Sequence, residues 1–290
     1  MISIIICTVN LKSIKEIEKN VSNTIGVEFE LIIIDNSRSQ YDIFQAYNIG
    51  AKRSQYSILC FMHDDLVYHS NNWGHEVIKH FNSSNTGMIG VGGTRFLSNI
   101  PTIWWAGGHK YFHSESGTVC HNCIDTNKNE PSNSKLNFIN PENSERSRVV
   151  ILDGLWFCIR KSLFEEIEFD EGNYKGFHFY DLDICMQVNI LKYDIFCIFN
   201  IRLEHISSST LNEEWIKNCN IFYKKWKSRL PMTYVNLPFK QLISIEIKAL
   251  ILLRNIYAIN KTPFSYLTFY RNISMLNLLS FNLKRLLYIN

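Results

Sequence analysis

The chain has 290 residues, of which 46% are hydrophobic and 20% are charged, and its formal net charge is +3. This composition suffices for one large core, or a core with an appendage, and excludes a largely disordered chain. Residues 239–290 hold seven lysines and arginines against one glutamate, a net charge of +6, which leaves the body at −3. A net acidic body argues against a nucleic-acid partner.

The N-terminal stretch MISIIICTVN lacks the basic segment of a signal peptide and is expected to form a first strand. No apolar run of the sequence reaches the roughly 18 to 20 residues of a membrane span. The eight cysteines, most of them within apolar stretches, are therefore expected to be free thiols of a cytoplasmic protein. Cys120 and Cys123 have a CxxC spacing, but no second pair completes a zinc site.

Apolar segments alternate with helix-like segments through the first half of the chain. Strands that are apolar throughout and alternate with helices indicate an α/β fold whose parallel sheet is covered on both faces. The expected strands are Ser3–Thr8, Phe29–Ile34, Ser57–Met62 and Thr86–Val91, and the expected helices are Leu11–Asn23, Tyr41–Arg53 and Trp73–Phe81.

The second half begins with a polar stretch, residues 113–147, which is expected to be a long loop or flexible insertion. Regular structure is expected to resume beyond it. The expected elements are an apolar segment at Val149–Arg160, a strand at Ile195–Ile201, and helices at Lys161–Ile167, Asp181–Leu191 and Glu213–Lys227.

Pro231 and Pro238 mark a boundary between a first domain, residues 1–230, and a tail, residues 231–290. The tail combines large apolar residues with scattered cations and is expected to be helical. A basic amphipathic helix can lie on an anionic membrane surface, and the same pattern suits helices that pack on the core or on another subunit. Both alternatives stay open, so we expect a cytoplasmic protein that is either free or at the inner face of the membrane.

Polar residues follow each of the first three expected strands: Thr8 and Asn10, then Asp35, then His63-Asp64-Asp65. Ligands of parallel sheets bind beyond the carboxyl ends of the strands. Neighbouring carboxylates repel each other when they are buried together. The Asp64–Asp65 pair is therefore solvated, part of a general-acid site, or bound to a hard divalent cation.

The stretches IIICTVN, LIIIDNS, AYNIGAKRSQYSILCFMHDD, GLWFCIRKSLFEE and GFHFYDLDICMQ follow one another along the chain. In this order and spacing they resemble the family 2 glycosyltransferases with the GT-A fold, over roughly residues 1–228. The resemblance implies a Rossmann-like, mostly parallel central sheet with helices on both faces, followed here by the helical tail. It also implies transfer of a hexosyl or N-acetylhexosaminyl group from a nucleotide sugar.

The resemblance further implies a set of binding residues. Asp65 and His205 would bind the divalent cation, Mn²⁺ or Mg²⁺. The chain departs from the family's Asp-x-Asp metal motif at its first position, which is His63. The residues that would bind the nucleotide are Thr8, Asn10, Asp35, Asn48, Gly50 and Asp64.

The family also implies a carboxylate that takes the proton of the acceptor hydroxyl. Asp181 stands at that position, Asp183 is the runner-up, and both would otherwise serve as helix N-terminal caps. Aromatic faces can pack against sugar rings, although core packing is an equal alternative for the tryptophans. The residues expected at the sugar or acceptor are Trp104, Trp105, Asp153 and Trp156.

The expected function is metal-dependent transfer, with inversion, from a nucleoside diphosphate sugar to a hydroxyl of a glycan or lipid-linked glycan. UDP is the carrier that the resemblance favours, with dTDP and GDP as alternatives. A nucleotidyltransferase is the first rival, but the segment TVNLKS after the first strand lacks the glycines of its phosphate loop. The second rival is a non-catalytic module that binds a nucleotide sugar.

Overall fold

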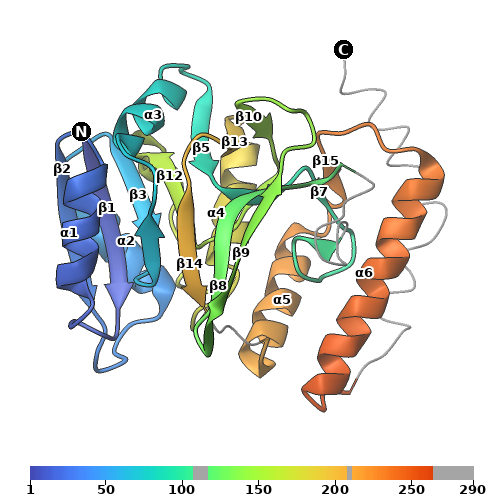
Figure 1. The fold of residues 1–290 in the computed structure, drawn as a ribbon. Coiled ribbons are helices and arrows are strands. Elements are labelled where there is room, and N and C mark those ends of the chain that lie inside the picture. The colour runs from blue at the N-terminus through green and yellow to red at the C-terminus, as the bar shows by residue number, and fades with distance from the viewer. Residues whose placement is uncertain (107–116, 208–210, 264–290) are drawn as a thin grey trace.

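The computed structural model describes residues 1–106, 117–207 and 211–263. Its central sheet has seven strands in the order β10-β13-β5-β12-β3-β1-β2 (Figure 1). Pairing directions show that five strands run one way, and that β10 and β12 run the other way. The strands are β1 (Ile2–Thr8), β2 (Phe29–Asp35), β3 (Ile58–Met62), β5 (Thr86–Gly90), β10 (Arg146–Arg148), β12 (Trp156–Arg160) and β13 (Asp194–Ile198).

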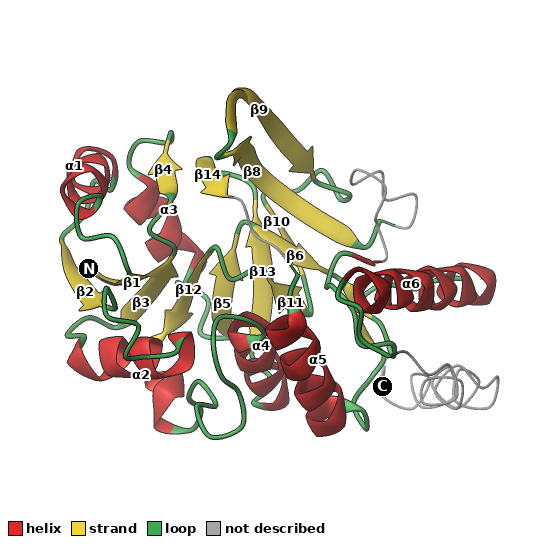
Figure 2. Ribbon diagram, turned by 90° about the horizontal axis from the view of Figure 1, so that it is seen from below, coloured by secondary structure: helices red, strands yellow, loops and turns green. Residues whose placement is uncertain are grey.

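Helices cover both faces of this sheet, with α1 and α3 on one side and α2, α4 and α5 on the other (Figure 2). The α/β arrangement with helices on both faces, expected from the alternation of apolar strands and helices, is confirmed. The helix expected at Lys161–Ile167 is a 3-10 helix that spans Lys161–Glu165. The α-helices are α1 (Ile14–Thr24), α2 (Ile43–Arg53), α3 (Trp73–His80), α4 (Tyr180–Ile190) and α5 (Glu213–Trp226).

The structure also contains a second sheet. Its strands follow the order β11-β6-β8-β14-β4, and β9 pairs with the other edge of β8. This sheet brings segments from distant parts of the chain to one side of the molecule. Its strands are β4 (Leu66–Tyr68), β6 (Gly92–Thr94), β8 (Val119–Asn127), β9 (Glu130–Ile139), β11 (Ile151–Leu152) and β14 (Leu203–Ser207).

The long loop expected over residues 113–147 is instead a β-hairpin over much of its length. Strands β8 and β9 pair antiparallel, with His121 opposite Ile139 and Asp125 opposite Lys135. These strands were not predicted because polar side chains occur on both faces of β8, so the sequence lacks the alternation of apolar and polar residues that marks a strand. Residues 113–116 of the expected loop lie outside the described part.

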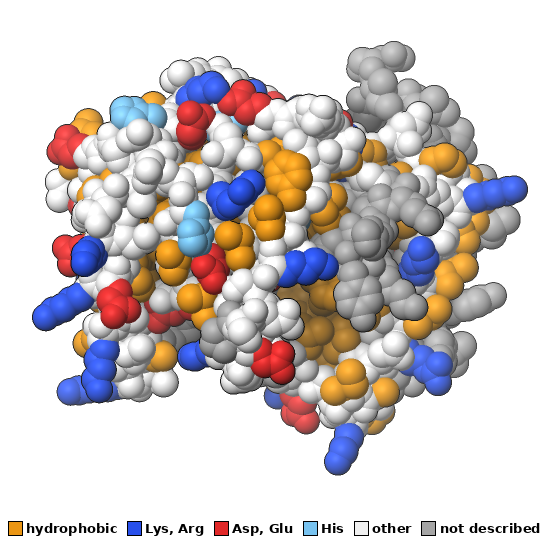
Figure 3. All heavy atoms as spheres, viewed as in Figure 1, with side chains coloured by type: hydrophobic (Ala, Val, Ile, Leu, Met, Phe, Trp, Pro, Cys, Tyr) orange, Lys and Arg blue, Asp and Glu red, His pale blue; other side chains and the backbone are white. Residues whose placement is uncertain are grey.

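The tail begins with β15 (Met232–Thr233), which pairs with β7 (Phe96–Leu97), and continues as the expected helix, α6 (Phe239–Ile259). Ile247, Ile251 and Ile259 of α6 are exposed, and Figure 3 shows hydrophobic and basic side chains intermixed along this edge. Among the residues described, no helix is both long enough and apolar enough to cross a membrane. Residues 264–290 of the expected tail lie outside that part.

Candidate active site

A cavity of about 590 Å³ opens at the carboxyl ends of β1 and β3, between the two sheets and the start of α4. Binding sites for small ligands commonly measure roughly 300–1,000 Å³. Carboxylates and imidazoles gather along its wall. The polar residues that line it include His63, Asp64, Asp65, Asp153, Asp181 and His205.

Three of these side chains form a candidate metal centre. Strand β3 ends at Met62 and delivers His63 and Asp65, while β14 delivers His205. The potential ligand atoms of the three residues lie within 4.8 Å of one another. Asp65 Oδ1 is 3.4 Å from His205 Nε2 and 3.9 Å from His63 Nδ1. The sequence thus located Asp65 and His205 together, and the structure adds His63.

The residues fit a divalent cation. Asp65 Oδ1 and His205 Nε2 are both buried, and His205 Nε2 has no contact beyond its 3.4 Å ion pair with Asp65 Oδ1, whereas buried polar atoms in folded proteins usually have a well-made hydrogen bond or a ligand. Burial, followed by the neighbouring His205, lowers the pKa of His63. A neutral imidazole is the form that binds a metal. Two imidazole nitrogens and one carboxylate oxygen are a donor set for a first-row cation such as Mn²⁺.

Asp181 lies in the first turn of α4 and lines the same cavity. The backbone N–H of Gly154 donates to Asp181 Oδ2 at 2.9 Å, which fixes the carboxylate. Burial, and then the charge of Asp153, raises the pKa of Asp181 to about 7. A carboxylate with such a pKa is a competent general base near neutral pH.

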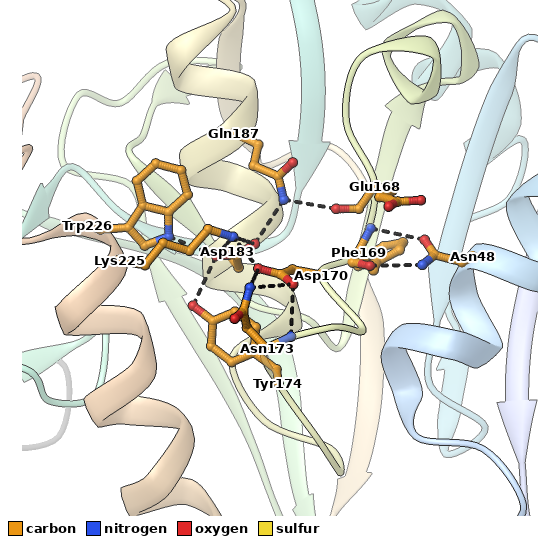
Figure 4. A network of polar contacts seen from close by, with 10 residues as sticks. All are labelled: Asn48, Glu168, Phe169, Asp170, Asn173, Tyr174, Asp183, Gln187, Lys225 and Trp226. Carbon is orange, nitrogen blue, oxygen red and sulfur yellow. Dashed lines mark hydrogen bonds and ion pairs between the residues drawn. The ribbon is translucent and has the colours of Figure 1, made fainter.

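Asp183, the runner-up for the base, is buried away from the cavity in a polar network (Figure 4). Lys225 Nζ lies 2.9 Å from its Oδ1. Tyr174 and Trp226 also donate to Oδ1, at 3.0 and 2.8 Å, and Gln187 donates to Oδ2 at 2.8 Å. These contacts occupy both oxygens of Asp183, so the geometry favours Asp181 as the base.

The residues expected at the nucleotide divide into two groups. The Thr8 hydroxyl donates to Asp64 and accepts the backbone N–H of Asn10 at 2.9 Å. Asp35 is exposed and pairs with Thr8 in the β1–β2 register. These four residues therefore lie together at the ends of β1, β2 and β3, next to the candidate metal centre.

Asn48 and Gly50 are not brought to the cavity. Asn48 Nδ2 donates to the Phe169 carbonyl at 2.8 Å, and Asn48 Oδ1 accepts the Phe169 N–H at 3.0 Å, so that it ties α2 to a distant loop (Figure 4). Gly50 faces β1, where an added Cβ would lie 2.3 Å from Ile5 Cγ2. Both residues serve packing between elements that support the site.

The tryptophans also divide. Trp104 and Trp105 line the cavity, and Trp104 Nε1 donates to Asp153 Oδ2 at 3.2 Å. Trp156 is fully buried in the core, where its Nε1 donates to the Tyr68 hydroxyl at 2.7 Å. The sugar or acceptor contact expected for Trp156 is therefore not available in this arrangement.

Several lining residues were not singled out in the sequence. Tyr180, Phe177, His178, Glu214 and Trp215 all face the cavity. Glu214 holds the turn before α4 by accepting the Phe177 N–H at 3.0 Å. The local signal was the GFHFYDLD stretch, in which an aromatic run directly precedes an acidic helix start.

Comparison with known proteins decides the family. A model described as "Glycosyltransferase like family" matches residues 3–229. The chain belongs to this family. The resemblance expected from the sequence motifs is thereby confirmed.

This glycosyltransferase-like protein is also similar to a curated protein, the streptomycin biosynthesis protein StrF of Streptomyces griseus. The two are 28% identical over 146 residues, which span 48% of this chain and 44% of that relative. The match thus covers less than half of the length of StrF.

Two solved structures are similar in fold. A structure of GalNAc-T7 with UDP, GalNAc and Mn²⁺ has a TM-score of 0.50 at 13% identity, covering 91% of this chain and 58% of that one. The mannosyltransferase PcManGT from Pyrobaculum calidifontis, in complex with GDP-Man and Mn²⁺, has a TM-score of 0.47 at 8% identity, covering 89% and 75%. The first likeness shows the GT-A fold for this chain.

Proposed function

We propose that this protein is a metal-dependent inverting glycosyltransferase that uses a nucleoside diphosphate sugar, with UDP as the favoured carrier. The observation that carries the proposal is the shared cavity: Asp181 lines it, and so does the His63–Asp65–His205 cluster. A donor whose diphosphate lies at the cluster would present its sugar toward Asp181 and the Trp104–Trp105 wall. The acceptor we propose is a hydroxyl of a glycan or lipid-linked glycan.

The reaction is a single displacement. Asp181 takes the proton of the acceptor hydroxyl as that oxygen bonds to the anomeric carbon, and the bond from this carbon to the diphosphate oxygen breaks. The anomeric centre inverts because attack and departure occur on opposite faces. A cation held by His63, Asp65 and His205, Mn²⁺ or Mg²⁺, would stabilise charge on the leaving diphosphate as a Lewis acid.

Other residues of this chain bind and orient. Thr8 fixes Asp64 at the strand exits, next to the exposed Asp35, where we place the nucleoside. Trp104 and Asp153 are joined by a hydrogen bond and would offer an aromatic face and a carboxylate to the sugar. Aromatic faces and polar edges together suit a sugar ring.

The test is product analysis on the purified chain with UDP-, GDP- and dTDP-sugars, with and without Mn²⁺. We expect release of a nucleoside diphosphate with one carrier, and a rise in melting temperature with that nucleotide and Mn²⁺ together. Release of pyrophosphate would instead identify a nucleotidyltransferase. Metal-dependent binding without turnover on any glycan or lipid-linked acceptor would identify a binding module.

We further propose that the protein acts in the cytoplasm, on an acceptor presented at the inner face of the membrane. The exposed isoleucines of α6, beside Lys240, Lys248 and Arg254, support that orientation, because basic amphipathic surfaces bind anionic lipid. Sedimentation with vesicles of anionic and neutral phospholipid tests it. Binding to neither would leave packing on protein, within the chain or on another subunit, as the role of this face.

A further inference from the structure

Strand β8 carries a second cluster of metal-ligating side chains, outside the cavity just described. His121, Cys123 and Asp125 occupy alternate positions of the strand and so share one face. Their potential ligand atoms lie within 4.8 Å of one another. His121 Nε2 is 3.4 Å from Asp125 Oδ2.

Neighbouring strands hold these side chains in place. Gly92 pairs with His121, and a Cβ at Gly92 would lie 2.9 Å from His121 Nδ1, so the glycine leaves room for the imidazole. Asn137 of β9 donates to Asp125 Oδ2 from the opposite edge of β8. His121 is 3% exposed and Cys123 is fully buried. The side chain of Asp125 is 39% exposed, so the cluster has a buried imidazole and thiol and opens to solvent at the carboxylate.

We propose that His121, Cys123 and Asp125 form a second metal site, one that selects Zn²⁺ or a cation of similar softness such as Co²⁺. Thiolate, imidazole and carboxylate are the ligands of four-coordinate zinc, and three of them leave one position open. Mg²⁺ and Ca²⁺ prefer oxygen donors and are disfavoured by the sulfur. One thiolate and one carboxylate also neutralise a divalent cation, which lowers the cost of burying it.

The CxxC spacing of Cys120 and Cys123 does not form this site. The two cysteines are three positions apart on one strand, so their side chains point to opposite faces of the sheet. Cys120 packs in one hydrophobic core cluster and Cys123 in another. Cys120 is therefore a matched control for Cys123, since both are fully buried cysteines of the same strand.

The second cluster lies beside the first. Strands β8 and β14 are paired so that Asp125 stands opposite His205, which belongs to the candidate centre at the cavity. The two clusters differ in donors, because only the one on β8 contains sulfur. We therefore expect the two clusters to bind different metals, with Zn²⁺ at the sulfur-containing cluster on β8 and Mn²⁺, which accepts both nitrogen and oxygen donors, at the cavity. A cation bound to β8 would stabilise this strand, which is hydrogen-bonded to β14, the strand that carries His205.

The test is a Co²⁺ titration of the reduced, metal-stripped full-length chain. A thiolate ligand gives Co²⁺ an intense near-ultraviolet charge-transfer band that nitrogen and oxygen ligands do not give. We expect the band in the wild type, in Cys120→Ser and in Cys7→Ser, whose thiol lines the cavity. It should also persist in His63→Ala, which removes a ligand of the other centre. Cys123→Ser should lose it, and Zn²⁺ should displace Co²⁺ and abolish it.

Zinc content after dialysis provides the second measurement, with about one tightly held ion per chain expected in the wild type and loss of that ion in Cys123→Ser. Circular dichroism establishes whether each variant is folded, and Asp125→Asn replaces Cys123→Ser if the latter is not. In Asp125→Asn we expect at least a tenfold weaker Co²⁺ affinity with the band still visible at saturation. Absence of a band in the wild type, or an undiminished band in Cys123→Ser, would overturn the site. Neither readout depends on sugar transfer.

Discussion

The imidazole Nε2 of His63 lies 2.7 Å from the hydroxyl oxygen of Tyr180. The Nδ1 atom of the same ring faces Asp65. Nδ1 can bind a cation only if it carries no proton, and the proton of the neutral ring then resides on Nε2. Nε2 would donate that proton to the Tyr180 hydroxyl. The Tyr180 hydroxyl can accept that proton and so supports the tautomer that a metal ligand needs, and Tyr180 directly precedes the candidate base, Asp181.

Replacing Tyr180 with Phe is therefore expected to weaken Mn²⁺ binding by about 10- to 100-fold, the usual effect of losing such an orienting partner. The aromatic packing stays in place, so the fold should persist. Calorimetric titration with Mn²⁺ measures the affinity. Tyr174→Phe is the matched control, because that hydroxyl bonds the distant Asp183, and its Mn²⁺ affinity should equal that of the wild type. Unchanged affinity in Tyr180→Phe would show that Tyr180 does not orient His63.

The donor set at the cavity predicts a metal preference. Mg²⁺ binds oxygen and tolerates imidazole poorly, whereas Mn²⁺ accepts both. With two histidines and one aspartate, the wild type is expected to use Mn²⁺ in clear preference to Mg²⁺. His63→Asp replaces one nitrogen donor by oxygen and should narrow that preference by roughly tenfold. Thermal shifts with UDP and each metal measure it, and a wild type that uses both metals equally would contradict the assignment of His63.

Asp181→Asn is expected to lower the activity and to raise the stability of the folded protein above neutral pH. The folded-state pKa of about 7 exceeds the ordinary 3.8, so between these values the folded protein keeps a proton that the unfolded chain has lost. Stability contributed by this group therefore falls as pH rises through that window and stays low above it. Because an asparagine side chain does not ionise, the variant does not lose stability in this way as pH rises.

We expect Asp181→Asn to be more stable than the wild type at pH 8, by a few kcal/mol at most, and equally stable at pH 3.5. Turnover should fall by about 10²- to 10⁴-fold, with nucleotide binding retained. Urea denaturation at the two pH values and a transfer assay measure these effects. A variant that is less stable than the wild type at pH 8, or fully active, would remove Asp181 from its role.

The network around Asp183 predicts a change in stability rather than in chemistry. Lys225 lies 2.9 Å from this fully buried carboxylate and also pairs with Asp170 at 2.7 Å. Lys225→Met leaves a buried charge without its cation, which costs about 3–5 kcal/mol. The exposed neighbour supplies the control, Lys224→Met, with a change below about 0.5 kcal/mol. Equal denaturation midpoints for the two variants would show that the ion pair is unimportant.

The sequence located the parts of the site that follow from hydrophobic pattern. Apolar runs stop where strands leave the core, so Thr8, Asp35 and Asp65 could be expected at one edge of the sheet. Asp181 and His205 were singled out by the family resemblance, although the acidic start of the helix that carries Asp181 is also visible locally. These features depend on neighbours in the chain, which a single sequence displays.

Features that depend on distant partners could not be foreseen. Asn48 finds its partner 121 positions away, at Phe169, and His63 meets Tyr180 across 117 positions. The pattern of polar residues along the chain does not predict which distant residue each side chain will contact. Strand β8 was missed for a related reason, because His121 and Asp125 on one face and Asn122 and Thr126 on the other stand where a buried strand usually carries aliphatic residues.

The buried carboxylate of Glu246 bears on how the chain can be shortened or recombined. On α6 it accepts the Ser98 hydroxyl at 2.7 Å and the Asn99 backbone N–H at 2.9 Å, just ahead of the Trp104–Trp105 wall. A fragment that ends at residue 230 would leave both donors without their acceptor beside the cavity. Residues 98–99 and the first turns of α6 must therefore be kept or exchanged together. A chimera that borrows the C-terminal helix of a relative would need that relative's residues at 98–99 as well.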